Sequence, residues 1–122
     1  MGSEASGYVV RSDDVQPFGF YGLWISDYTS GKNSNSSIAL IDVPADASHP
    51  LAYSRRSDKY YFVVTGRVSF TVDNSTDELG PSDLLVLPAG TRFAYRAIGD
   101  AAQLLLVHTP AFDPDAEVIL DA

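Results

Sequence analysis

From residue 51 onward, short runs of strand-forming residues alternate with turn-forming residues, and this rhythm constrains the fold more than any other feature. The runs 59–64 and 84–87 are rich in β-branched, aromatic or aliphatic side chains. Residues typical of tight turns follow or precede them, as in Thr65-Gly66 and Pro88-Ala89-Gly90. Strand-like runs separated by turn signals about every 8–12 residues predict an all-β sandwich or barrel. We find no apolar stripe of helical period, so little or no helix is expected.

The whole chain is predicted to form one domain. The runs expected to be strands are 8–10, 18–25, 38–43, 51–55, 59–64, 68–72, 84–87, 92–96 and 103–108. The polar segment 29–37 and the proline-containing segment 44–50 are expected to be loops. Residues 1–7 are interpreted as a flexible leader and residues 8–112 as the barrel. Residues 113–122 form an acidic tail in which Val118-Ile119-Leu120 is a possible edge strand.

Composition excludes several classes of function. The chain has 122 residues, no cysteine and a formal net charge of −8. An acidic chain lacks the basic face that binds a phosphate backbone, so no nucleic acid partner is expected. There is no apolar run of about 18 residues, so no membrane partner is expected. The first residues have neither the basic nor the apolar part of a secretory signal, and a cytoplasmic location is expected.

Two stretches of this chain resemble the cupin superfamily. Tyr61-Phe62-Val63-Val64-Thr65-Gly66 resembles the end of the first cupin motif, and Pro88-x-Gly90 after an apolar strand resembles the skeleton of the second. The segment 104–110 is similar to the last strand of the family. The resemblance covers residues 38–112 and implies a double-stranded β-helix, or jelly-roll barrel. It also implies a homodimer, since small cupins commonly pair.

The metal-binding positions of the family are substituted in this chain. The resemblance places Lys59 at the position of the family's glutamate and Phe93 at the position of the second motif's histidine. A protonated amine is a poor ligand and a phenyl ring has no donor atom. The first motif's two histidines fall on Ala52 and Ser54 or, with the shorter spacing, on Tyr53 and Arg55. No metal and no other cofactor is therefore expected.

The inward positions of the family, carried over to this chain, imply an aromatic pocket for a small oxygenated or anionic metabolite. Lys59, Tyr61 and His108 are the candidate catalytic residues. Lys59 is a base, nucleophile or anion-binding group in the pocket, a structural cation paired with a carboxylate such as Asp58 or Asp83, or a rim residue whose amine reaches water past Tyr61. The residues expected to contact the ligand are Tyr53, Ser54, Arg55, Phe93, Tyr95 and Trp24.

The second histidine, His49, lies between Ser48 and Pro50 and is predicted to be a solvated loop residue. The leading functional hypothesis is a metal-independent isomerase, epimerase, cyclase or lyase that binds a small molecule. The alternatives are a non-catalytic binding or sensor module and a structural dimeric barrel. Turnover by the protein and its loss on substitution of Lys59 would separate the first hypothesis from the other two.

Overall fold

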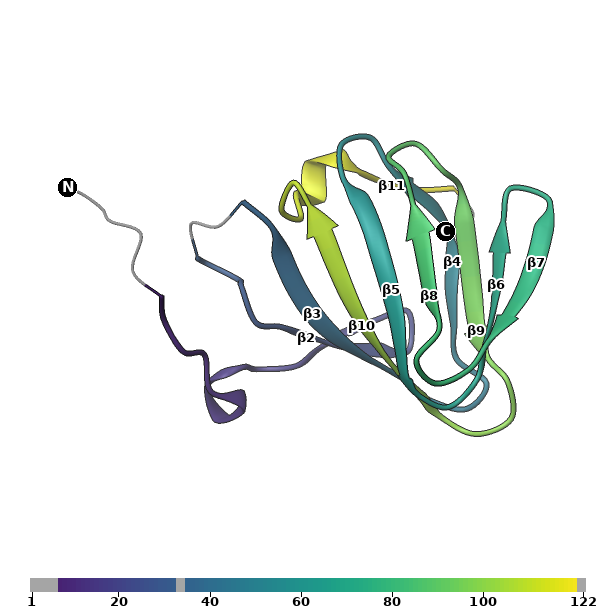
Figure 1. Cartoon of the computed structure of the whole chain (residues 1–122), viewed down its shortest axis with the longest axis horizontal. Helices are drawn as coiled ribbons and strands as arrows, with labels where there is room; N and C mark the ends of the chain where they lie inside the picture. The colour runs from purple at the N-terminus through teal and green to yellow at the C-terminus, as the bar shows by residue number, and fades with distance from the viewer. Residues whose placement is uncertain (1–6, 33–34, 121–122) are drawn as a thin grey trace.

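Two antiparallel sheets face each other and enclose the core (Figure 1). The computed structural model describes residues 7–32 and 35–120. The first sheet has six strands in the order β1-β2-β3-β10-β5-β8, and the second has five in the order β11-β4-β9-β6-β7. The strands are β1 (Phe18–Phe20), β2 (Leu23–Asp27), β3 (Ser37–Val43), β4 (Ser48–Ser54), β5 (Asp58–Thr65), β6 (Val68–Val72), β7 (Ser75–Leu79), β8 (Leu84–Leu87), β9 (Phe93–Ala97), β10 (Ala102–Thr109) and β11 (Glu117–Ile119). The expected all-β architecture is confirmed.

The long central strands show the period-two pattern that this fold needs. In β10, every second residue from Ala102 to His108 is buried, and the residues between them are half-buried. In β5, Lys59, Tyr61 and Val63 are buried and their neighbours lie toward the outside. Because side chains alternate across a strand, both strands direct one set of side chains between the two sheets. The inner set forms the core with residues of the second sheet such as Phe70.

Gly66 occupies a turn where both backbone and space require a glycine. It links β5 to β6 with φ of +82°, a conformation that residues with a side chain rarely adopt. A Cβ atom added at this position would lie 2.7 Å from the Cα atom of Ala102. The turn therefore holds the end of β5 close to the start of β10, which is its neighbour in the sheet.

Three expectations about local structure were wrong. Strand β4 begins at Ser48 and runs through Pro50, although the prolines of segment 44–50 predicted a loop. Proline lacks only its own N–H group, so it is tolerated near the start of a strand. Strand β7 was missed because its residues Ser75–Leu79 are mostly polar and exposed. Residues 8–10 form no strand.

The acidic tail folds back onto the barrel. A short 3₁₀ turn, η2 (Pro114–Ala116), leads into β11, which pairs with β4 at the edge of the second sheet. An ion pair between Arg56 and Asp113 (3.1 Å) and a bond from the Arg55 N–H to the Ala116 carbonyl (2.8 Å) hold this segment. The other helical element is the 3₁₀ turn η1 (Ser12–Asp14). Within the described ranges, no helix is long and apolar enough to cross a bilayer.

Candidate functional site

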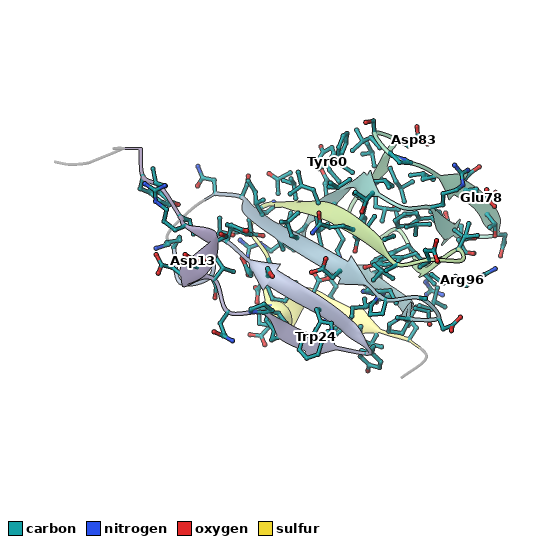
Figure 2. All side chains as sticks on the ribbon, turned by 90° about the horizontal axis from the view of Figure 1, so that it is seen from below. Asp13, Trp24, Tyr60, Glu78, Asp83 and Arg96 are labelled. Carbon is teal, nitrogen blue, oxygen red and sulfur yellow. The ribbon has the colours of Figure 1, made fainter. Side chains whose placement is uncertain are left out.

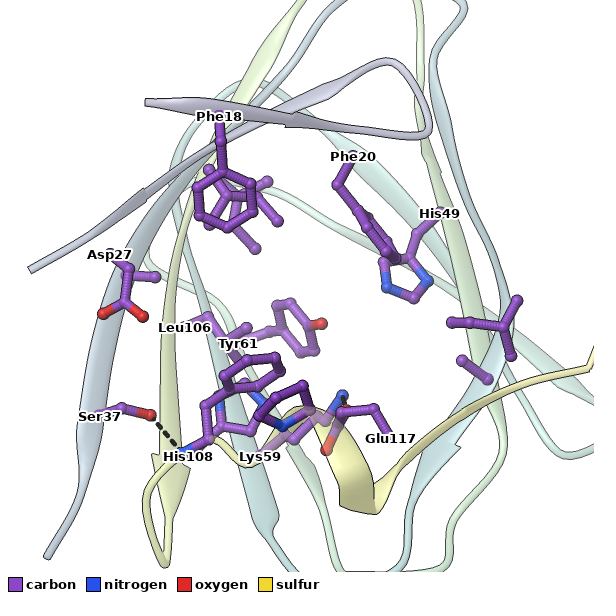
Figure 3. A pocket seen from close by; sticks show the side chains of 17 residues that line it. Phe18, Phe20, Asp27, Ser37, His49, Lys59, Tyr61, Leu106, His108 and Glu117 are labelled. Atoms are coloured by element: carbon purple, nitrogen blue, oxygen red, sulfur yellow. Dashed lines mark hydrogen bonds and ion pairs between the residues drawn. The ribbon is translucent and has the colours of Figure 1, made fainter. Parts of the chain in front are cut away.

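A cavity of about 280 Å³ lies inside the barrel (Figure 3). Strands of both sheets and the folded-back tail contribute to its wall, and most of the lining side chains are apolar. Figure 3 shows Lys59, His108 and Glu117 gathered on one side of the cavity, with Phe20 and His49 across it. The volume is just below the range of roughly 300–1,000 Å³ that is common for small-molecule sites. An apolar chamber with a few convergent polar groups suits a small metabolite.

Lys59 and Glu117 form a buried ion pair in the cavity wall. The Nζ atom of Lys59 donates to Oε1 of Glu117 over 2.6 Å, and the two side chains are 6% and 15% exposed. The same Nζ atom lies 4.7 Å from the ring centroid of Phe93, a cation–π distance. Burial lowers the pKa of Lys59, and the adjacent carboxylate opposes this shift. The ammonium is therefore a stronger acid than an exposed lysine.

The partner of Lys59 is not the one that the sequence suggested. Of the two predicted acids, Asp58 accepts a hydrogen bond from the Ala89 N–H and Asp83 accepts one from the Gly80 N–H. Glu117 was missed because it lies in the tail, outside the motifs. The predicted edge strand, 118–120, began one residue after Glu117, whereas β11 includes it. The available signal was the spacing of Glu117 and Ile119, because residues two apart share a face of a strand. Both residues line the cavity.

His108 stands beside this ion pair. It lies directly opposite Lys59 in the β10–β5 ladder and opposite Ser37 in the β10–β3 ladder. Burial, and secondarily the positive charge of Lys59, lowers the pKa of His108 to about 3. The imidazole is therefore neutral at physiological pH, and its buried Nε2 atom has no hydrogen-bond partner. The second carboxylate oxygen of Glu117, Oε2, is also buried without a partner.

Tyr61 projects into the cavity between the ion pair and His49, as Figure 3 shows. It is 1% exposed, and its ring contacts the ring of Tyr95 edge-on with a centroid distance of 5.3 Å. Burial raises the pKa of the Tyr61 phenol well above its usual value. Tyr61 is therefore a protonated phenol, able to donate a hydrogen bond but poorly suited to act as a base.

His49 lines the cavity and was wrongly predicted to be a solvated loop residue. It is 9% exposed, and its ring stacks on Tyr95 with a centroid distance of 5.0 Å. The ladder between β4 and β9 is irregular between His49 and Ala52, and this shift lets both residues face inward despite their odd spacing. Simple alternation counted back from Ala52 would have turned His49 outward.

The hydrogen bonding of His49 fixes its tautomer. Its Nδ1 atom lies 2.7 Å from the carbonyl oxygen of Pro50, which can only accept. Nδ1 therefore carries the proton, and in the neutral ring Nε2 holds the lone pair. The carbonyl of Pro50 therefore orients the imidazole of His49 in the cavity wall.

The structure divides the remaining predicted site residues into two groups. Phe93 and Tyr95 are buried in the aromatic layer next to the cavity, and Ser54 is buried with its Oγ accepting from the Ser57 N–H. Tyr53 and Arg55 alternate with Ala52 and Ser54, and they therefore lie on the outer side of β4. Tyr53 is half-buried beneath Arg92, and Arg55 is exposed.

Trp24 is also outside the cavity. It is 52% exposed and lies between the inward residues Leu23 and Ile25 on the outer face of β2. Trp24, Tyr53 and Arg55, which the sequence predicted to contact the ligand, therefore do not line this cavity. Phe18 and Phe20 supply the aromatic wall instead, from β1.

The residues at the family's metal positions do not fit a transition metal. An ammonium group and a phenyl ring come together here, and the ammonium is already bonded to a carboxylate. Ala52, which also lines the cavity, has no donor atom. In the parts of the chain that the structure describes, no three His, Asp or Glu side chains are grouped so as to hold a metal ion. We derive no chemistry through a metal.

The Cupin_2 family model, described as a cupin domain, matches residues 39–109. The chain belongs to this family. An uncharacterized protein of Streptomyces coelicolor, SCO3923, is 29% identical to this cupin over 82 residues, covering 65% of this chain and 74% of the relative. The sequence resemblance to cupins is thereby confirmed.

Solved structures share the fold of this cupin at low identity. Pac13, described as a unique nucleoside dehydratase, superposes with a TM-score of 0.83 at 21% identity and covers 94% of this chain and 92% of its own. A variant of Streptomyces PAC13 solved with uridine superposes equally well, at 22% identity and with the same coverage. KdgF from Halomonas gives a TM-score of 0.78 at 15% identity, covering 90% of this chain and 98% of its own. Identities of this size show a common fold alone.

Proposed function

We propose that this cupin is a metal-independent enzyme that binds an uncharged, hydroxyl-bearing ring compound of nucleoside size and eliminates water from it. The observation that carries the proposal is the buried Lys59–Glu117 ion pair at the side of a largely apolar cavity. Burying an ion pair costs free energy of folding, because both charges lose their contact with water. A buried group in a cavity whose pKa is shifted is often part of a functional site.

The charges around the cavity favour an uncharged ligand over an anion. Among the lining residues that the structure describes, Lys59 is the only lysine or arginine, and Glu117 already neutralises it. Asp27 adds a second carboxylate, while His108 is neutral. An anion would meet a lysine that is already paired with a carboxylate. A hydroxyl group, in contrast, can donate to the unpartnered Oε2 of Glu117 or to Nε2 of His108.

The polar groups suit the elimination of water from a β-hydroxy carbonyl compound. The unpartnered Oε2 atom of Glu117 takes the proton from the carbon next to the carbonyl, and the electron pair of that C–H bond becomes part of the C=C bond. The C–O bond of the leaving hydroxyl breaks as the Lys59 ammonium donates a proton to it, and water departs. The proton on Glu117 then passes to Lys59 through their hydrogen bond, which restores the ion pair. Lowering of the pKa of Lys59 by burial makes it a better proton donor for this step.

The apolar wall contributes in two ways. Phe20 and Tyr61 offer ring faces and edges to a planar ligand, and they exclude water from the polar cluster. Exclusion of water strengthens the electrostatic effect of Lys59 on a developing negative charge. The similarity to Pac13, a nucleoside dehydratase also solved as variants with uridine, supports both the ligand class and the reaction class.

Binding is tested by titrating uridine and uridine 5′-monophosphate into the protein and measuring heat and thermal stability. We expect uridine to bind and to raise the melting temperature, and the phosphate ester to bind at least about tenfold more weakly, a difference of about 1.4 kcal/mol. Stronger binding of the phosphate ester would contradict the argument from charge.

Turnover is tested with nucleosides that carry a carbonyl group two carbons from a hydroxyl, and the loss of water is followed by mass spectrometry. We expect Lys59→Met and Glu117→Gln each to lower kcat by at least about a hundredfold, the usual scale for a general acid or base. Tyr53→Phe is the control, because Tyr53 lies outside the cavity. Unchanged turnover by Lys59→Met would refute the proposed mechanism, and binding without turnover would favour a non-catalytic binding module.

A further inference from the structure

The polar groups of the cavity lie in a definite order along one wall. His108 of β10 and Lys59 of β5 are directly opposite each other in the ladder of these strands, and Lys59 donates to Glu117 of β11. Figure 3 shows the three side chains in the order His108, Lys59 and Glu117 along one side of the cavity. Tyr60, which alternates with Lys59 on β5, points to the outside of the molecule (Figure 2). Lys59 therefore lies between an imidazole and a carboxylate.

His108 is the member of this row that the proposed elimination does not use. Its side chain lines the cavity and is 6% exposed, and no group among the described residues forms a hydrogen bond with its buried Nε2 atom. The ring of Phe112 contacts the imidazole edge-on, with a centroid distance of 5.3 Å. A buried nitrogen without a partner costs free energy of folding, and such atoms are rare in native proteins. A group of the ligand is therefore the natural partner of Nε2.

A hydroxyl group is well suited to pair with Nε2 of His108. In a neutral imidazole, Nε2 either donates a hydrogen bond or accepts one, depending on the tautomer. A hydroxyl group can do both, so it pairs with Nε2 in either tautomer, whereas a carbonyl or ether oxygen can only accept. The ligand class proposed above carries hydroxyl groups, so the remaining question is which of them meets His108.

The order of the three groups answers this question. The answer rests on the proposed function, in which Glu117 takes the proton from the carbon next to the carbonyl and Lys59 protonates the leaving hydroxyl group on the adjacent carbon. His108 lies on the far side of Lys59 from Glu117 (Figure 3). The next carbon of the substrate, beyond the one that loses its hydroxyl group, therefore lies beside His108.

We propose that His108 is a specificity-determining residue that holds a second hydroxyl group of the substrate, on the carbon next to the leaving hydroxyl group and away from the carbonyl. The substrate is then a vicinal diol rather than a deoxy sugar. Lys59 acts on one hydroxyl group of the diol, and His108 binds the other. In a nucleoside with a carbonyl at the 5′ carbon, the leaving hydroxyl group is at the 3′ carbon, and the hydroxyl group that meets His108 is at the 2′ carbon.

The test combines changes in the ligand with changes in the protein. Calorimetry measures the binding of uridine, 2′-deoxyuridine and 3′-deoxyuridine to the wild-type protein and to His108→Leu. We expect the wild type to bind uridine at least about tenfold more tightly than 2′-deoxyuridine, because a site built around a hydroxyl group rejects a ligand that lacks it. In His108→Leu, this preference should fall to within about twofold, through weaker binding of uridine alone. The preference for uridine over 3′-deoxyuridine should not change.

Two further variants separate recognition from structure. His108→Gln keeps a group that can donate and accept, so it should retain part of the preference for uridine over 2′-deoxyuridine. Gln103→Leu changes a residue on the outer side of the same strand, where Gln103 bonds to Asp42, and it should keep the whole preference. Circular dichroism monitors folding. If His108→Leu does not fold, His108→Gln decides, and it should lower the preference at least about threefold.

Four results would overturn the proposal. Equal binding of uridine and 2′-deoxyuridine by the wild type is the first. Equal weakening of both ligands in His108→Leu is the second, because it identifies a structural residue. Loss of the preference over 3′-deoxyuridine instead is the third, because it places the leaving hydroxyl group at His108. These three results leave the proposed ligand class intact, whereas a wild-type protein that binds none of the three nucleosides would overturn that class and the role of His108 together.

Discussion

Removing the charge of Glu117 should destabilise this cupin far more than removing an exposed carboxylate does. In Glu117→Gln, the Lys59 ammonium loses its 2.6 Å partner while remaining buried, with only 6% of its side chain exposed. Removing one partner of a buried pair typically costs about 3–5 kcal/mol, because the other charge is left uncompensated. The protein can limit this cost by releasing the proton of Lys59. For a lysine with the ordinary pKa of 10.5, releasing the proton at pH 7 costs about 5 kcal/mol. The cost of deprotonating Lys59 is therefore similar to the cost of leaving its charge buried without a partner.

The loss of stability in Glu117→Gln should depend on pH, whereas a loss caused only by poorer packing should not. Burial lowers the pKa of Lys59, and Glu117 is the group that raises it. In Glu117→Gln, the folded-state pKa therefore falls further below the unfolded value. Between these two pKa values the unfolded chain binds more protons, so the stability of the variant rises with pH, by up to about 1.4 kcal/mol per pH unit. The deficit relative to wild type should be largest near neutral pH and should shrink toward pH 10.

Urea denaturation at several pH values measures these differences directly. At neutral pH, we expect a loss of about 3–5 kcal/mol, or a fall in melting temperature of about 12–20 °C. The double variant Lys59→Met with Glu117→Leu removes both charges and should recover to within about 1 kcal/mol of wild type. Glu78→Gln is the matched control, because the Arg67–Glu78 pair is more than half exposed and should cost less than about 0.5 kcal/mol. The reasoning would be refuted if Glu117→Gln left the free energy of unfolding unchanged, or if the double variant were as unstable as the single one.

Three further predictions concern other groups. The pKa of His108 is about 3 in the folded protein and 6.5 in the unfolded chain, so on acidification the unfolded chain binds the proton first. The free energy of unfolding of the wild-type protein should therefore fall by about 2 kcal/mol between pH 7 and pH 5. Urea titration of His108→Gln should not show this loss. Gly66→Ala should lower the free energy of unfolding by about 2–4 kcal/mol, because the added Cβ atom would lie 2.7 Å from Ala102. Gly90 has a similar φ but faces open space, so Gly90→Ala should lower it by about 1 kcal/mol in the same assay. Treatment with EDTA should leave the melting temperature and uridine binding unchanged, since the cavity holds an ammonium group where a metal cupin needs a ligand.

The sequence predicted the barrel well because its information is local. Alternation and turn residues located β6 at 68–72 and β8 at 84–87 without error, and β5, β9 and β10 to within one residue at each end. Alternation failed at His49, because the ladder between β4 and β9 is irregular there and changes which side chains face inward. The neighbouring Pro50 also suggested a loop where β4 runs. Ladder irregularities depend on the neighbouring strand, so they are not visible in one segment.

The sequence predicted the part of the candidate site that lies on regularly alternating strands, and it missed the part that depends on long-range pairing. Lys59, Tyr61 and His108 lie on the two strands with the clearest alternation, and all three line the cavity. Glu117 reaches the same cavity only because the tail folds back on β4, a long-range pairing that no motif indicates. The choice between the inward pair Ala52 and Ser54 and the outward pair Tyr53 and Arg55 depended on the register of β4, and only the structure resolved it.

The substitution at the family's glutamate position explains why the tail matters to this barrel. A lysine at that position introduces a positive charge into a low-dielectric interior, where it is stable only with an opposite charge close by. None of the acids in the barrel motifs supplies it, since Asp58 and Asp83 bond to backbone N–H groups. Glu117 supplies it from β11, so the chain beyond the matched residues 39–109 completes both the core and the cavity. The requirement for an opposite charge therefore makes the tail part of the functional unit, and a cupin with Lys59 but no acid in an equivalent place should be unable to keep its lysine charged.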